Sequence, residues 1–304
     1  MPLVPGPDAN QERYAVKTIR PLWRVPGIVI RERIHPAGRE RIPEPMVMND
    51  PEAVAEFHAG GASNPGMRGV YDFCARALDA LLPSGGHLLD LGVGSGRALS
   101  AVLRRRPDVR ATAVDLAPNM LSTARKLFDE EGLGDRAELV EADITTLREP
   151  ITTRPWDAIS CMWTLHQLPD FNVLRGALSQ VAAIQRRSGA AVWITDFHRL
   201  RDPAAVSKML VCVDPDSPEV LRRDAMASEA AAFTLAELST ELSASGLHGM
   251  HSGHSTPLPY LQAYWMFGAR GKPGVVSGTR GSELRGQARR EAAMLRWGFT
   301  AKPF

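Results

Sequence analysis

The chain has 304 residues, of which 44% are hydrophobic and 23% charged, and its formal net charge is +2. This composition is typical of a soluble enzyme with a sizeable core, and a charge so close to zero gives no reason to expect a nucleic-acid or membrane partner. Three widely spaced cysteines, Cys74, Cys161 and Cys212, match neither a zinc site nor a disulfide framework. The first residues do not resemble a secretory signal, and no stretch is apolar for the ~18–20 residues that cross a bilayer. We therefore expect a cytoplasmic protein.

Both ends of the chain differ in composition from its middle. Residues 1–50 are rich in proline and arginine, which predicts an extended arm, with a short strand or hairpin at 27–34 where apolar residues alternate weakly. Residues 271–304 form a basic tail, in which 282–297 could be a helix. The tail has no RNA-binding motif. Either the arm or the tail could join two copies of the chain into a homodimer.

The middle, residues 51–270, alternates short apolar runs with helical patterns and is read as one domain. A helix at 51–58, a loop at 60–66 and a capping helix at 67–82 come first. An irregular stretch at 203–226 falls within an insertion at 199–233, and Thr234 with Glu237 has the spacing of a capping box. The strands expected are 87–91, 110–115, 137–141, 157–163, 190–196, 246–254 and 261–269, and the other helices are 98–105, 119–131, 173–187 and 234–245. This alternation predicts an α/β, doubly wound, Rossmann-like sheet with helices on both faces.

A glycine-rich turn joins the first strand to the next helix in the sequence LLDLGVGSGRAL, residues 88–99. Gly92, Gly94 and Gly96 allow a sharp turn and a close approach by a ligand, which the free amides of the helix start would face. Such a loop also serves dinucleotides. Asp90, at the end of the strand, would repel a pyrophosphate but attract a ligand that carries an ammonium group.

Further acidic residues stand at the ends of the next two strands. Asp115 could accept both hydroxyls of a ribose, and Leu116 beside it could lie against an adenine ring. Asp143, followed by Ile144, could accept a hydrogen bond from the adenine amine. Because the carboxyl ends of parallel strands meet at one edge, these residues together predict a site for an adenosine-bearing cofactor.

In this order, the motifs resemble those of the class I S-adenosylmethionine-dependent methyltransferases. Asp90 with the three glycines resembles the first motif of that family, Asp115 with the PNML that follows resembles the second, and Ala142-Asp143-Ile144 the third. Residues 156–170, which end in LHQLPD, resemble its fourth strand and exit loop. The resemblance covers about residues 67–197 well and the stretch to residue 269 loosely, whereas the arm and the tail have no counterpart in the family core.

The resemblance implies a sheet of seven strands, mostly parallel with an antiparallel last strand. It also implies that Asp90, Gly92 and Gly94 hold the methionine part of S-adenosylmethionine, that Asp115 binds the ribose, and that Asp143 and Ile144 bind adenine. The expected function is methyl transfer to the oxygen or nitrogen of a small molecule, such as a secondary metabolite. Alternatives are a nicotinamide-dependent oxidoreductase on the same fold and a non-catalytic subunit that binds S-adenosylmethionine. A nucleic-acid methyltransferase would normally show a clearer basic face.

Candidate catalytic residues stand at the ends of the fourth and fifth strands. His166 could take the proton of a hydroxyl or amine as it is methylated, and Asp196 with His198 could form a second acid–base pair. Arg68 and Tyr71, one helical turn apart on the capping helix, could bind the cofactor carboxylate or the substrate. His248, His251 and His254 recur at a spacing that does not put 248 and 251 on one face of a strand, so no metal site is expected.

Overall fold

The computed structural model describes residues 21–215, 217–269, 271 and 278–304. The beginning of the predicted arm and residues 272–277 of the predicted tail lie outside this part. The strands are β1 (His87–Leu91), β2 (Arg110–Asp115), β3 (Ala137–Glu141), β4 (Ala158–Met162), β5 (Ala191–Phe197), β6 (His251–His254) and β7 (Leu261–Met266). The α-helices are α1 (Val25–Ile34), α2 (Pro51–Ser63), α3 (Pro65–Asp79), α4 (Arg97–Arg105), α5 (Pro118–Glu130), α6 (Phe171–Ser188), α7 (Ala205–Val213), α8 (Glu219–Ala231), α9 (Leu235–Ala244) and α10 (Gly286–Gly298).

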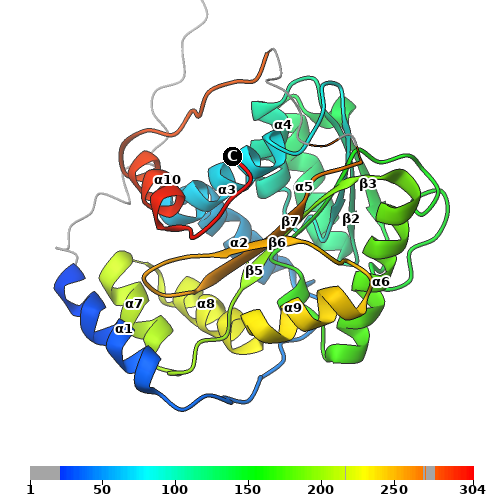
Figure 1. Ribbon diagram of the computed structural model, residues 1–304. Helices are drawn as coiled ribbons and strands as arrows, with labels where there is room; N and C mark the ends of the chain where they lie inside the picture. The colour runs from blue at the N-terminus through cyan, green and yellow to red at the C-terminus, as the bar shows by residue number, and fades with distance from the viewer. Residues whose placement is uncertain (1–20, 216, 270, 272–277) are drawn as a thin grey trace, which may run out of the picture.

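The strands form one sheet in the order β3-β2-β1-β4-β5-β7-β6 (Figure 1). Strands β1 to β5 are parallel, and β7 runs antiparallel to both β5 and β6. The predicted seven-stranded, doubly wound sheet with an antiparallel last strand is thereby confirmed. The strand order reverses between β1 and β4, and in open α/β sheets ligands bind at the carboxyl edge of such a point.

Alternation along the strands sends neighbouring residues to opposite faces of the sheet. Leu88 packs in a core with α3, α4 and α5, whereas Leu89 packs in a second core with α6 and α9. Helix α10 lies against α3 on the first of these faces (Figure 1). It comes so close that a Cβ on Gly69 would lie 2.9 Å from the backbone nitrogen of Ala292. The tail is therefore part of the packed body from α10 onward.

Two of the wrong local predictions lie in the arm and in the loop before the capping helix, where prolines and glycines were read as helix breakers. Residues 27–34 are not a strand or hairpin but belong to α1, whose Pro26 lies in the first turn, where proline is tolerated. Residues 60–63 are not a loop but the end of α2. A Cβ on Gly60 would lie 2.7 Å from Leu221, and one on Gly61 would lie 2.8 Å from the Tyr71 hydroxyl. These glycines allow close packing of helices.

The predicted irregular stretch at 203–226 is mostly helical. Helix α7 packs against α1 in a small core of its own that contains Ile28, Val206 and Cys212, and α8 follows (Figure 1). The capping box of Thr234 and Glu237 is present at the start of α9, as predicted. The arm from residue 21 onward thus lies on the body and contacts segments that come more than 150 residues later in the chain.

Candidate functional site

The three glycines of the loop after β1 have different surroundings, although all have positive φ angles of 76°, 53° and 81°. A Cβ on Gly92 would lie 2.1 Å from the Thr164 hydroxyl oxygen, and one on Gly96 would lie 2.9 Å from the Phe128 ring. A Cβ on Gly94 would meet nothing within 4 Å. Gly92 and Gly96 are thus required by packing within the protein, whereas Gly94 faces open space that a ligand can approach.

Asp115 ties the end of β2 to this loop. Its Oδ2 accepts a hydrogen bond of 2.8 Å from the backbone N–H of Gly94, and its Oδ1 accepts one of 2.9 Å from Ala117. Burial raises the pKa of this carboxyl, while the backbone donors work in the opposite direction. The side chain remains partly exposed, and a carboxylate has lone pairs for about four hydrogen bonds, so it can still accept hydroxyl groups.

The other two acidic residues of the predicted cofactor site differ in exposure. Asp90 is only 2% exposed and accepts a 2.5 Å hydrogen bond from the Ser160 hydroxyl. Burial raises its pKa to about 7, so it lies beneath the glycine loop as a weak acid. Asp143 is partly exposed, and its Oδ1 accepts hydrogen bonds from the amide and hydroxyl of Thr145. Ile144 is buried, and Leu116 is partly buried.

This edge therefore offers open space at Gly94, a partly exposed carboxylate at Asp115 and apolar surface at Leu116 and Ile144. That combination fits an adenosine-bearing ligand with ribose hydroxyls. The contacts of the predicted cofactor residues with the ligand stay predictions.

His166 and Asp196 meet at the ends of β4 and β5. The Asp196 carboxylate binds the histidine twice, with Oδ1 2.7 Å from Nδ1 of the ring and Oδ2 3.0 Å from the backbone nitrogen. We assign the Nδ1 proton to His166 because Asp196 can only accept there. The remaining ring nitrogen, Nε2, is therefore the one that can take a proton.

The environment of His166 favours its charged form. Burial opposes the imidazolium, but the Asp196 carboxylate outweighs it, with help from Glu44 and Asp224, and raises the pKa of His166 above its usual range. The Phe197 ring lies edge-on to the imidazole, with centroids 5.3 Å apart. A group that reaches Nε2 therefore meets a basic imidazole that has the Phe197 ring beside it and carboxylates nearby.

The sequence analysis suggested that His198 pairs with Asp196. In the structure, His198 instead lies at the start of α9. Its Nδ1 accepts a 2.9 Å hydrogen bond from the backbone N–H of Leu235. Burial, together with His254 and Arg199, lowers the pKa of His198 to about 4. This histidine is therefore neutral at physiological pH and acts as an acceptor at a helix start.

The glycine loop packs against Thr164, which belongs to the same segment as His166. This residue packs against Gly92, and its hydroxyl donates to the backbone oxygens of Gly92 and Met162. It lies two residues before His166 and directly after Trp163, whose φ of 52° is unusual for a residue other than glycine. A ligand on Gly94 and a group at His166 would thus occupy neighbouring parts of one edge.

Comparison with known proteins agrees with this geometry. Residues 88–189 match a family described as a methyltransferase domain. The structure of the mitomycin 7-O-methyltransferase MmcR superposes with a TM-score of 0.51 at 21% identity, over 72% of this chain and 58% of that one. Residues 88–189 are therefore similar to a methyltransferase domain, and the sheet has the fold of the mitomycin enzyme. S-adenosylmethionine is the cofactor of this family.

Two relatives match this chain over less than a third of its length. The methyltransferase ctvB of Aspergillus terreus is 40% identical over 83 residues, which are 26% of this chain and 35% of that protein. A polyamine aminopropyltransferase of Neisseria meningitidis is 32% identical over 100 residues, 31% of this chain and 38% of that protein. The matches thus span little more than a third of these relatives, so they identify the domain and leave the activity of the whole chain open.

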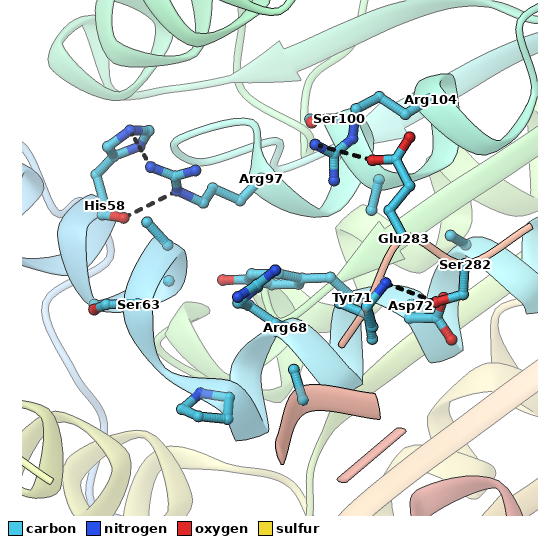
Figure 2. A pocket seen from close by; sticks show the side chains of 18 of the residues that line it. His58, Ser63, Arg68, Tyr71, Asp72, Arg97, Ser100, Arg104, Ser282 and Glu283 are labelled. Carbon is cyan, nitrogen blue, oxygen red and sulfur yellow. Dashed lines mark hydrogen bonds and ion pairs between the residues drawn. The ribbon is translucent and has the colours of Figure 1, made fainter. Parts of the chain in front are cut away.

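Arg68 and Tyr71 line a cavity of about 1200 Å³ between α2, α3, α4 and residues 281–288 (Figure 2). Arg97, the first residue of α4, also faces it and is held by His58, whose Nε2 lies 2.7 Å from the guanidinium. The Tyr71 ring is buried, and its centroid lies 6.0 Å from that of Trp163. Tyr71 thus stands between this cavity and the loop that carries Thr164. A contact of Arg68 or Tyr71 with the cofactor stays a prediction.

Sequence reasoning missed the residues of the arm that reach the site. Glu44 places its Oε2 3.9 Å from Nε2 of His166, and Arg41 donates to the backbone oxygen of His166. Their only signal in the sequence was an arginine- and proline-rich composition. Within the described residues, no group of three potential ligands could hold a metal ion, and no helix is long and apolar enough to span a membrane.

Proposed function

We propose that this protein transfers the methyl group of S-adenosylmethionine to a hydroxyl or amine of a small molecule. The observation that carries the proposal is the packing of Thr164, two residues before His166 of the buried His166–Asp196 pair, against a glycine loop with an open side at Gly94. The first feature suits a nucleoside cofactor, and the second suits proton removal from an acceptor. A binding subunit without catalysis would need only the first.

S-adenosylmethionine, when bound, supplies a methyl group that its sulfonium has already activated. The tasks left to the protein are to align the acceptor, to exclude water and to take a proton. Asp196 fixes the imidazole so that Nε2 faces the acceptor, and it stabilises the imidazolium that forms. Phe197 and Tyr260, whose rings lie 5.3 Å apart, supply an apolar wall. We infer that the acceptor is compact and partly aromatic.

Transfer of a different group is the second candidate, because the chain is also similar to an aminopropyltransferase over 100 residues. The mass of the product separates the two: methyl transfer adds one methylene to the acceptor. Calorimetry with S-adenosylmethionine and with NADH, together with native mass spectrometry of the protein as expressed, tests the cofactor. Binding of NADH alone would overturn the proposal.

Gly94→Val tests the position of the cofactor. The added side chain would fill the open space beside Asp115, so binding of S-adenosylmethionine should be lost. Gly132→Val is the matched control, because Gly132 also has a positive φ, 67°, and open space around it, but lies in the turn after α5. Equal affinity in the two folded variants would show that the cofactor does not approach Gly94.

A further inference from the structure

The arm is fastened to the segment that carries His166. The guanidinium of Arg41 lies over the Phe233 ring, 4.1 Å from its centroid, and donates to four backbone oxygens. These belong to His166 (2.7 Å), Leu168 (2.5 Å), Pro169 (2.7 Å) and Ala231 (2.5 Å). Hydrogen bonds from a charged donor are the strong ones, so the arm and the loop after β4 are held as one unit.

Glu44 follows Arg41 by three residues and faces the free side of His166. Asp196 occupies Nδ1, and the Glu44 carboxylate stands 3.9 Å from Nε2. The Glu44 side chain is 15% exposed, and its Oε1 is buried without a hydrogen-bond partner in the part of the chain described. A buried carboxylate is stabilised by a cation nearby, and a protonated His166 imidazole would lie within ion-pair distance of it.

Charged groups near His166 come from several elements. Asp196 comes from β5, Glu44 from the arm and Asp224 from α8, while Arg41 binds the backbone oxygen of His166. Burial raises the pKa of both Glu44 and Asp224, because the charged form of each carboxyl group loses solvation there. Three carboxylates around one buried imidazole are more than is needed to orient the ring.

We propose that Glu44 is a positioning residue that the arm contributes to the acceptor site, where it stabilises the His166 imidazolium formed during transfer. This rests on the proposed function. In the step, the acceptor heteroatom bonds to the methyl carbon, the carbon–sulfur bond breaks with its electron pair going to sulfur, and the proton passes to Nε2. The imidazolium then lies between the carboxylates of Asp196 and Glu44 until the proton leaves to solvent.

The first test needs neither cofactor nor acceptor. The imidazole of His166 is titrated by NMR in the wild type, in Glu44→Gln and in Glu40→Gln, with His166→Gln to assign the signal. Glu40 is an exposed glutamate of the same arm. Removal of the Glu44 charge should move the His166 midpoint to lower pH, and the Glu40 change should leave it in place. An equal midpoint in all three proteins would overturn the proposal.

The second test follows the rate. Glu44→Gln should lower kcat about tenfold, which corresponds to ~1.4 kcal/mol, with little change in KM and with the acid limb of the pH profile shifted to lower pH. Glu44→Asp, which keeps the charge, should restore part of the rate. If Glu44→Gln does not fold, Glu44→Ala, which also removes the charge, takes its place in the titration, and a midpoint equal to that of the wild type overturns the proposal. A changed KM with an unmoved profile would show that Glu44 only holds the arm.

His166→Gln distinguishes failure of the proposed base, His166, from failure of the role proposed for Glu44. If it keeps the wild-type rate, the base assigned under the proposed function is wrong, whatever the titration of Glu44→Gln shows. In that case a shifted midpoint would establish the contact but overturn the role in transfer. If His166→Gln is impaired and the midpoint is unmoved, the base stands and the role of Glu44 fails.

Discussion

The proposed cofactor edge, at the ends of β1 to β3, and the proposed acceptor edge, at the ends of β4 and β5, are built in different ways. At the ends of β1 to β3, a short stretch of chain forms the site, and backbone geometry dominates: positive φ angles at three glycines and amides that bind Asp115. At the ends of β4 and β5, side chains dominate, and Glu44, His166, Asp196 and Asp224 come from four distant segments. Backbone-made sites leave a local pattern in a sequence, whereas sites assembled from distant side chains leave none.

The largest effect should come from the acceptor edge. His166→Ala should lower the rate of methyl transfer by ~10²–10⁴ and leave the affinity for S-adenosylmethionine unchanged, because the base acts only on the acceptor. Since only the neutral imidazole accepts a proton, the wild-type rate should fall as pH drops through the pKa of His166, which its carboxylates raise above ~6.5. A greatly lowered methyl-transfer rate, with the calorimetric affinity for S-adenosylmethionine equal to that of the wild type, supports this prediction. Equal loss of both would contradict it.

At the cofactor edge, Asp115→Ala should weaken binding of S-adenosylmethionine by roughly 10–150-fold, the effect of ~1.5–3 kcal/mol for hydrogen bonds to a charged acceptor. The same substitution leaves the amides of Gly94 and Ala117 without their acceptor, so a melting curve must accompany the calorimetry. Asp143→Ala is the comparison, because Asp143 lies two residues after the next strand, β3. An affinity within about threefold of the wild type would reduce Asp115 to a turn residue.

The two edges also differ in how well the sequence predicted them. Strands 87–91, 110–115 and 137–141 were predicted to the residue from their apolar runs. The sequence indicated Asp196 as an acid at a strand end but paired it with His198 instead of His166, because a sequence pattern relates only residues that are close along the chain. Glu44 and Arg41 could not be found, because their contacts lie more than 120 residues away in the chain.

A middle-sized effect is expected where the arm joins the body. Arg41→Met would keep the stem of the side chain but leave four backbone oxygens without their donor, so unfolding in denaturant should require about 1.5–3 kcal/mol less. Because the loop of His166 loses its fastening, kcat should fall as well, while cofactor affinity should hold. Arg33→Met, an exposed change in the same arm, is the control. An unchanged kcat would separate the arm from the acceptor edge.

The smallest effect on catalysis is expected at His198, and it decides whether this residue belongs to the acceptor edge. Its Nδ1 serves the N–H of Leu235, so His198→Ala should cost about 1 kcal/mol of stability and change kcat less than about twofold. Thr234→Ala removes another acceptor at the same helix start and is the matched comparison, with a similar cost of ~1 kcal/mol.

The pH dependence of stability gives a sharper test of His198. Its folded pKa of about 4 lies below the unfolded value of ~6.5, so between these values the unfolded chain binds more protons than the folded one. Stability contributed by the neutral ring is therefore present above pH ~6.5 and is lost as pH falls toward 4. Melting curves of His198→Ala should show a weaker loss over this range than the wild type, and those of Thr234→Ala the same loss. If His198→Ala melts like the wild type but has a lower kcat, His198 belongs to the acceptor site. A histidine that only accepts a hydrogen bond at a helix start should not affect kcat.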